Sequence, residues 1–138
     1  MTVNYRIRKY KSQDLSKVKK LVAKWYWSFF TDNHYAKFVA VSGDAIVGVA
    51  VTSITLGTAN LDFIFVSNDS RLKGMGRSLL RQVEQNAHSK RAEGLGVNCV
   101  AENKIAQRFY KKNRFQRVGQ VYNYFSNGNL QVFFWKRI

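Results

Sequence analysis

The chain has 138 residues, of which 46% are hydrophobic and 14% are aromatic. This is enough apolar area for one compact domain and too much for an intrinsically disordered chain. Lys and Arg number 23 against 8 Asp and Glu, a net charge of +15 at pH 7. Such an excess predicts an acidic partner, such as a phosphate ester, a nucleic acid or an anionic surface, unless the basic surface serves only solubility.

Cysteine and histidine are scarce in the sequence. Cys99 is the only cysteine, which excludes an internal disulfide, a four-thiolate zinc site and an iron–sulfur cluster. His34 and His88 lie far apart and predict no metal site. Neither a signal-peptide-like run nor a membrane-spanning window of about 20 apolar residues occurs. We therefore expect a soluble cytoplasmic protein that forms a single domain over residues 1–138.

The first elements are a strand and a helix. Residues 3–9 alternate apolar and polar side chains, which predicts a strand. Ser12 or Asp14 is placed to cap the helix that follows. Positions three and four residues apart predict that one buried stripe of this helix holds Leu15, Val18, Val22, Trp25 and Phe29.

Three strands are predicted next, as an antiparallel meander. Residues 35–41 and 45–54 are apolar runs joined by Ser42-Gly43-Asp44, a hairpin signal. A turn at residues 56–58 leads into a third run over residues 59–66. Little room is left near residues 30–35 for a second helix, so this side of the sheet is expected to hold an open cleft.

The second half of the chain predicts helices and further strands. From Gly74, apolar residues recur every four positions, which predicts a helix that ends before Gly94. The strand at 95–101 then requires a right-handed crossover and parallel pairing. A helix over 104–113 and a hairpin of 115–125 with 130–136, around Asn127-Gly128, complete the pattern. The fold class is α+β, with a mixed and mostly antiparallel sheet.

The segment from Val66 to Ser78 predicts an anion site. An apolar strand ends at Val66, and two glycines open the next helix, whose first backbone N–H groups have no helical partner. Gly74 and Gly76 lack a Cβ, so a pyrophosphate can approach the backbone closely. The helix dipole and the side chains of Arg71, Lys73 and Arg77 add positive potential. The alternative is an ordinary glycine-containing loop before a basic helix.

Neither standard nucleotide loop is present: a Gly-Lys-Ser/Thr ending is lacking, and Leu79 stands where the dinucleotide fingerprint has its third glycine. The pattern Arg71-x-x-Gly74-x-Gly76 instead resembles motif A of the GNAT superfamily, the acetyl-CoA-dependent N-acetyltransferases. The resemblance extends over roughly residues 59–118. The strand before motif A is similar in Leu61-x-x-Ile64-x-Val66, and the strand after it in Leu95-x-Val97. The motif B helix is similar in Asn103-x-x-Ala106-x-x-Phe109-Tyr110-x-Lys112-x-x-Phe115. Arg114 departs from the family, which usually has Gly there, and puts the end of that helix in question.

The resemblance implies a GNAT-like three-layer fold, with flanking helices and a splay between the strands that contain Val66 and Leu95. It implies transfer of an acetyl group from acetyl-CoA, the co-substrate, to a primary amine within a ternary complex, without a metal. The pantetheine arm would pair with the backbone of Ile64, Phe65 and Val66. The pyrophosphate would be bound by a run of eight residues: Arg71, Leu72, Lys73, Gly74, Met75, Gly76, Arg77 and Ser78.

Further roles follow from the same resemblance. Asn103 would contact the pantetheine, Lys112 a phosphate of the coenzyme, and Tyr110 the thioester sulfur. Amine attack on a thioester also needs a proton acceptor, an N–H donor for the oxyanion and a proton source for the thiolate. Val66 N–H or its neighbour would be the oxyanion donor and Tyr110 the acid, unless Tyr110 only packs at the end of its helix.

The base is chosen among the carboxylates. Most of the eight fit caps, turns or helix surfaces, which leaves Asp62 and Glu102. Asp62 lies in an apolar strand beside the predicted thioester site, where a carboxylate can become a better base. An outward-facing Asp62 and a water chain without a dedicated base are the alternatives.

The acceptor is not specified by any motif. The charge of +15 disfavours polycationic acceptors and favours an amine on an acidic carrier, such as a protein, the ribosome or a tRNA. A non-catalytic coenzyme A-binding regulator is one rival interpretation. Another is a nucleic-acid-binding module that uses Lys104, Arg108, Lys111, Lys112, Arg114 and Arg117. The aromatic C-terminal hairpin, with Phe133, Phe134 and Trp135, could cover a second subunit of a homodimer.

Overall fold

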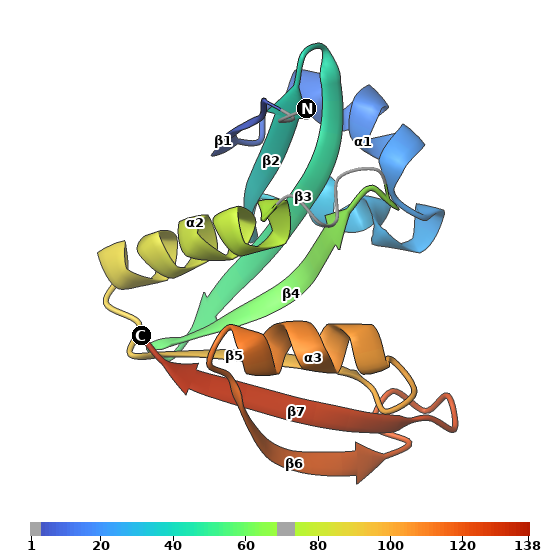
Figure 1. Ribbon diagram of the computed structural model, residues 1–138, viewed down its shortest axis with the longest axis vertical. Helices are drawn as coiled ribbons and strands as arrows, with labels where there is room; N and C mark the ends of the chain where they lie inside the picture. The colour runs from blue at the N-terminus through green and yellow to red at the C-terminus, as the bar shows by residue number, and fades with distance from the viewer. Residues whose placement is uncertain (1–3, 69–73) are drawn as a thin grey trace.

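The computed structural model describes residues 4–68 and 74–138. Within these residues, seven strands form one sheet in the order β1-β2-β3-β4-β5-β7-β6 (Figure 1). The strands are β1 (Arg6–Lys9), β2 (Ala36–Ser42), β3 (Ala45–Thr55), β4 (Thr58–Val66), β5 (Gly94–Val100), β6 (Gln116–Tyr122) and β7 (Leu130–Arg137). The α-helices are α1 (Leu15–Leu21), α2 (Met75–Ser89) and α3 (Lys104–Lys112), and two 3₁₀-helices are η1 (Ser12–Asp14) and η2 (Lys24–Phe30).

The sheet is mixed and mostly antiparallel, as predicted. Strands β2, β3 and β4 form the expected antiparallel meander, and β6 and β7 form the expected hairpin. Strands β4 and β5, which flank α2 in the chain, are parallel. None of the described helices is long and apolar enough to cross a membrane.

Strands β4 and β5 meet at one end and part at the other. Their pairing consists of Thr58↔Gly94, Ala59↔Leu95 and Asn60↔Gly96. Beyond Asn60, β4 continues along β3 while β5 continues along β7, and Figure 1 shows the two strands diverging. The splay implied by the resemblance is therefore confirmed.

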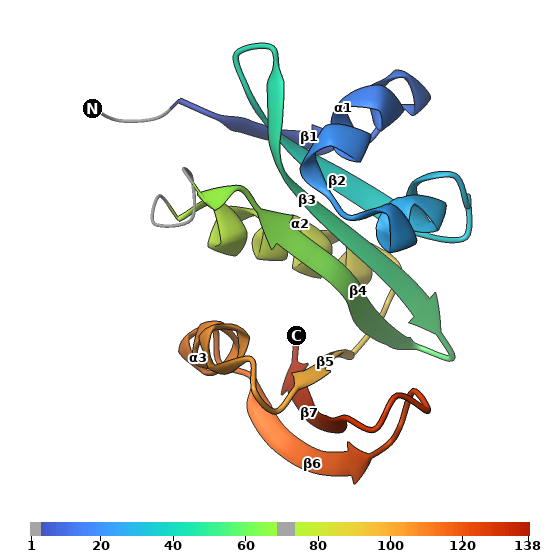
Figure 2. The same cartoon turned by 90° about the vertical axis from the view of Figure 1, so that its right-hand side faces the viewer.

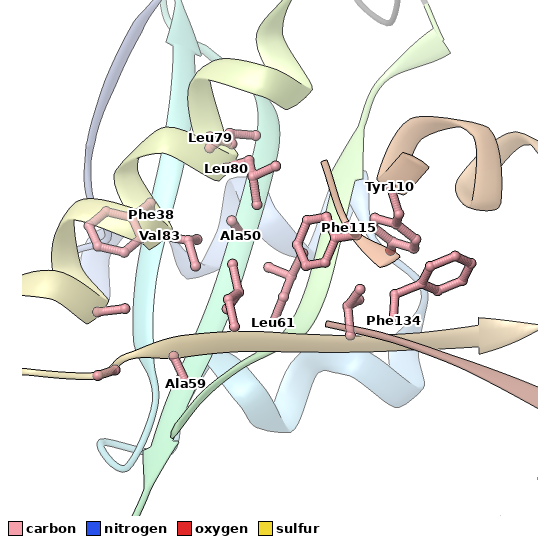
Figure 3. Close-up of a cluster of buried hydrophobic side chains, with 14 of the residues drawn as sticks. Phe38, Ala50, Ala59, Leu61, Leu79, Leu80, Val83, Tyr110, Phe115 and Phe134 are labelled. Atoms are coloured by element: carbon pink, nitrogen blue, oxygen red, sulfur yellow. The ribbon is translucent and has the colours of Figure 1, made fainter. Parts of the chain in front are cut away.

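Helices cover the two faces of the sheet unequally. Helices α2 and α3 pack on one face, where buried residues of α2 such as Leu79 and Val83 meet Leu61, Leu95 and Phe134 (Figure 3). On the other face, α1 and η2 enclose a second core with β2, β3 and β4. In Figure 2 the half of the sheet formed by β5, β7 and β6 carries a helix on one side, and among the described elements none lies on the other side.

A β-bulge in β4 changes which way its side chains point. Val51 pairs with Phe63 and Thr52 with Leu61, so Asp62 is the extra residue. Leu61 packs in the core under α2, as expected for its position, but Phe63 packs against the core under α1 and η2. Asp62 and Phe63 therefore lie on the same face, opposite to α2.

The prediction of one continuous first helix was wrong. Helix α1 ends at Leu21 because Val22 is extended (φ −114°, ψ 152°), and η2 follows as a separate 3₁₀-helix. Trp25, predicted to be buried, is 77% exposed, whereas Phe30 is buried. The prediction assumed 3.6 residues per turn, and a 3₁₀-helix has three. The 3₁₀-helix η2 occupies the second half of the predicted first helix, and residues 31–35 hold no helix.

Three smaller predictions also need correction. Asp14 makes no side-chain bond to the N-terminus of α1, because its carboxylate accepts bonds from the Arg8 guanidinium and from Lys11 N–H. Phe134 is 1% exposed and packs inside its own chain, so it cannot cover a second subunit. The strand predicted over 115–125 ends at Tyr122, which leaves Tyr124 in the hairpin loop.

Arg114, the position that departs from the resemblance, takes a left-handed backbone conformation. Its φ is +71°, in the left-handed region, and its N–H donates to Lys111 O at 3.1 Å. Helix α3 therefore ends in the usual left-handed turn, although a residue with a Cβ occupies it.

Candidate functional site

The start of α2, the end of β4 and helix α3 meet around Gly76. A Cβ built on Gly76 would lie 3.1 Å from Cε1 of Phe109 in α3 and 3.9 Å from Cγ2 of Val66 in β4. The first turn of α2 thus stands at the open end of the splay. The missing Cβ makes room for the Phe109 ring, a reason for this glycine that differs from the close phosphate approach expected from the sequence.

The first turn of α2 offers backbone donors. Gly74 is the N-cap residue, with φ 74° and ψ 9°, and a Cβ on it would meet no atom within 4 Å. The first intrahelical bond runs from Ser78 N–H to Gly74 O, at 3.1 Å. The N–H groups of Met75, Gly76 and Arg77 precede that bond, so they are the donors that a helix start leaves for an anion.

Other residues expected at the anion site have structural contacts. The Met75 side chain is fully buried in the core, so only its backbone can face a ligand. Ser78 Oγ lies 2.9 Å from the Tyr5 hydroxyl and 3.1 Å from Gly74 O. Arg71, Leu72 and Lys73, also expected at this site, lie outside the described residues.

A basic groove runs between α2 and the end of α3. The groove has a volume of ≈ 170 Å³, and Arg77 and Lys112, two residues expected to bind the coenzyme, both line it. Sequence reasoning missed Arg81, although its position four residues after Arg77 places it on the same helical stripe. The remaining lining residues are Leu80, Glu84, Asn113, Arg114 and Lys136. Since Lys136 pairs with Glu84, the groove has positive charge left for phosphate groups.

Tyr110 is held on the inner side of α3. It is 6% exposed, and its ring contacts Phe115 and Phe134 at centroid distances of 5.6 and 5.7 Å (Figure 3). Ile64 and Val66 of β4 pack against the same core cluster, as does Cys99 of β5. The core cluster that contains Tyr110 is thus contacted by residues from both arms of the splay.

Burial sets the protonation of Tyr110. It raises the pKa of the phenol well above its ordinary value of 10, with a smaller contribution from Cys99. Burial also raises the pKa of the Cys99 thiol. At neutral pH Tyr110 therefore carries its proton and can give it to a developing anion.

Asp62 stands where the splay begins, two residues after the last pair between β4 and β5. Its Oδ2 accepts a bond from Ser53 Oγ–H at 2.7 Å, and its Oδ1 accepts one from Asn60 Nδ2–H at 2.8 Å. The side chain is half-buried and held in one orientation. A carboxylate fixed in this way can accept a proton or bind a cation.

Asn103 has a structural role in this fold. Its Oδ1 accepts the N–H of Ala106 at 3.0 Å and so caps the N-terminus of α3. The cap fixes the start of the helix that carries Phe109 and Tyr110. Within the described residues, no group of three or more His, Cys, Asp or Glu side chains could hold a metal ion.

Comparison with known proteins identifies the family. Residues 7–128 match the family model of the acetyltransferase (GNAT) domain. That is most of the chain, which therefore belongs to the GNAT acetyltransferase family. No curated protein sequence matches the chain.

Solved structures agree in fold. The ribosomal-protein-S18-alanine N-acetyltransferase from Escherichia coli is 20% identical, with a TM-score of 0.83, 98% of this chain covered and 94% of that one. Ard1 from Thermoplasma volcanium is 19% identical, with a TM-score of 0.84 and 97% of each chain covered. A GNAT family acetyltransferase from Elizabethkingia anophelis, with acetyl-CoA bound, is 18% identical, with a TM-score of 0.79 and coverages of 98% and 99%.

Proposed function

We propose that this member of the GNAT acetyltransferase family, acting as one domain over residues 1–138, transfers the acetyl group of acetyl-CoA to a primary amine in a ternary complex. The observation that carries the proposal is the parting of β4 and β5 after Asn60↔Gly96, next to the first turn of α2. An extended arm can lie between the parted strands while a diphosphate binds the helix start. A structural relative with acetyl-CoA bound supports this choice of co-substrate.

Several residues would hold the coenzyme. The pantetheine would run along the backbone of Ile64, Phe65 and Val66, with Asn103 at its side. Its diphosphate would bind the N–H groups in the first turn of α2. Arg77 and Lys112, which line one groove, would neutralise its phosphate charges.

The chemical step is direct attack. The amine nitrogen forms a bond to the thioester carbon, and the carbonyl oxygen becomes an oxyanion. When the carbon–sulfur bond breaks, the carbonyl re-forms and the leaving thiolate takes the proton of Tyr110. The ammonium of the product intermediate loses its proton to Asp62, and solvent restores both groups. Acid and base thus approach the reacting atoms from different elements.

A charged partner is compatible with this function. Helix α3 carries Lys104, Arg108, Lys111 and Lys112 with no carboxylate among its nine residues. An acceptor on an acidic carrier, such as a ribosome or a tRNA, would be attracted to such a surface. The lone Cys99 is suited to a reducing cytoplasm.

The test combines binding and transfer. We expect calorimetry to show acetyl-CoA binding, and the label of radioactive acetyl-CoA to appear in one fraction of a cell lysate only when the protein is present. Arg77→Ala and Lys112→Ala should each weaken acetyl-CoA binding by about threefold to tenfold, as loss of one charge-assisted contact does. Lys111→Ala is the matched control, since Lys111 is exposed on α3 but does not line the groove.

The outcomes separate the alternatives. Acetyl-CoA binding without any labelled fraction would favour a non-catalytic coenzyme A-binding regulator. RNA binding that falls steeply with salt and is indifferent to acetyl-CoA would favour a nucleic-acid-binding module. Absence of acetyl-CoA binding would refute the proposal.

A further inference from the structure

The face of β5, β7 and β6 that lies opposite α3 has its own side-chain pattern. On β5 and β7, Leu95, Val97, Val132 and Phe134 point into the core under α2 and α3. Residues between them in the strands point the other way. The pairs Gly96↔Trp135 and Asn98↔Phe133 therefore lie on the face that, among the described elements, no helix covers (Figure 2).

This uncovered face is aromatic. Tyr124, in the hairpin loop, packs edge-on against Phe133 at a centroid distance of 5.0 Å, and it remains 53% exposed. Across the splay, the β4 bulge turns Phe63 and Phe65 to the same side of the sheet, with their rings stacked at 6.4 Å. On this arm η2 covers part of the face, and Tyr26 stacks on Phe63 at 4.1 Å. The mouth of the splay on this side thus has aromatic rings on both arms.

Asp62 lies at the vertex of that mouth. Asn60, which donates to Asp62, is opposite Gly96, and a Cβ on Gly96 would lie 3.6 Å from Asn60 Oδ1. The carboxylate accepts two bonds from neutral groups, Ser53 and Asn60. Two oxygens offer about four acceptor positions, so room for further donors remains.

The environment of Asp62 differs from that of the other buried carboxylates. Asp14 pairs with Arg8, and Glu84 pairs with Lys136. In the part of the chain that is described, Asp62 has no cation within ion-pair distance, although the protein has a net charge of +15. A half-buried carboxylate of this kind complements a ligand that brings one positive charge.

We infer that the acceptor is a single protonated primary amine joined by a short chain to an aromatic or branched apolar group. This inference rests on the proposed function and adds the substrate class. The ammonium binds Asp62 and loses its first proton to solvent before the attack, so that Asp62 is still ionised when the intermediate needs a base. The apolar group contacts Tyr124 and Phe133. A compound with several separated charges is disfavoured, because the surrounding protein is strongly positive.

The test compares amines that differ only in the ring. For the wild-type protein, kcat/KM should be at least about tenfold higher for 2-phenylethylamine than for propylamine, since a buried apolar group gives discrimination of this size. Tyr124→Ser should reduce that ratio to near one. Tyr122→Ser is the matched control, because Tyr122 is also exposed on the same hairpin, at 70%, but pairs with Leu130 on the opposite face. It should keep the wild-type ratio.

Further measurements identify the source of the amine and distinguish failure of this inference from failure of the proposed acetyl transfer. A Phe-Gly-Gly amide that is acetylated better than 2-phenylethylamine would point to a polypeptide N-terminus, and the reverse order would point to a free amine. A wild-type ratio near one, or equal losses in Tyr124→Ser and Tyr122→Ser, would overturn the inference. If no amine is acetylated, the proposed function fails and the assignment of an acceptor fails with it. Calorimetric binding of 2-phenylethylamine that is weaker only in Tyr124→Ser would then show an amine-binding site without acetyl transfer.

Discussion

The ring of Phe109 lies where Gly76 would carry a side chain, with Cε1 3.1 Å from the Cβ position. Helix α3 is thereby seated directly on the first turn of α2. Gly76→Ala should destabilise the protein by about 1–2 kcal/mol, because a well-packed site has no room for a methyl group. It should also weaken acetyl-CoA binding, since the helix start would shift. Urea unfolding and calorimetry measure the two effects.

The double variant Gly76→Ala/Phe109→Leu provides the control. A smaller side chain at position 109 removes the clash, so the double variant should lose less stability than the sum of the single variants. Additive losses would show that Phe109 is not the group that the methyl meets.

Arg114 provides a stabilising substitution. Its φ of +71° is strained for a residue with a Cβ, and Arg114→Gly should therefore stabilise the protein by about 0.5–1 kcal/mol in urea unfolding. Arg114→Ala loses the charge but keeps the Cβ, so it should bring no such gain. Equal stabilities of the two variants would exclude backbone strain as the cause.

The ion pair between Arg8 and Asp14 makes stability depend on pH. Both carboxylate oxygens of Asp14 accept bonds of 2.8 Å from Arg8, and these bonds, with a smaller contribution from Lys11 N–H, hold the pKa of Asp14 below its usual range. A depressed pKa stabilises the fold above the unfolded value of about 3.9, and this stabilisation is lost as the pH falls through the folded value. Asp14→Asn should thus cost about 1–3 kcal/mol at pH 7 and less at pH 3. A cost that is the same at both pH values would contradict this account.

Tyr110 provides a test of the acid. Tyr110→Phe keeps the ring contacts with Phe115 and Phe134 and removes the proton donor. We expect kcat to fall by about 10²-fold or more, with little change in KM, as for a group that acts in the transition state. Stopped assays of acetyl transfer measure both values, and an unchanged kcat would remove Tyr110 from this role.

Sequence periodicity correctly predicted the elements that have one side buried in the core and the other side exposed to solvent. Helix α2 repeats its apolar residues every four positions, and its predicted core residues Leu79 and Val83 are fully buried. The hairpins were readable for a similar reason, since apolar strands alternate with short loops that contain glycine.

The features that shape the site left weaker signals. The bulge at Asp62 adds one residue to β4, so every later side chain of the strand points to the other face. The residues on both sides of the bulge are apolar, so the alternation of apolar and polar residues does not reveal it. The spacing of the aromatic residues in η2 also fits the buried stripe of an α-helix. The sequence pattern alone therefore does not distinguish an α-helix from the 3₁₀-helix that this segment forms. The contact between Gly76 and Phe109 joins distant segments, so no local pattern could predict it.

The short parallel ladder between β4 and β5 has a mechanical consequence. The ladder between the two halves of the sheet has three pairs, between Thr58–Asn60 and Gly94–Gly96, and one further backbone bond runs from Glu93 N–H to Gly57 O at 3.2 Å. This seam therefore resists separation less than the longer ladders on either side. A coenzyme bound in the gap would contact both halves of the sheet and so stabilise them against separation. Native-state hydrogen exchange should then show slower opening of β5 and β7 when acetyl-CoA is added, with β2 and β3 changed much less.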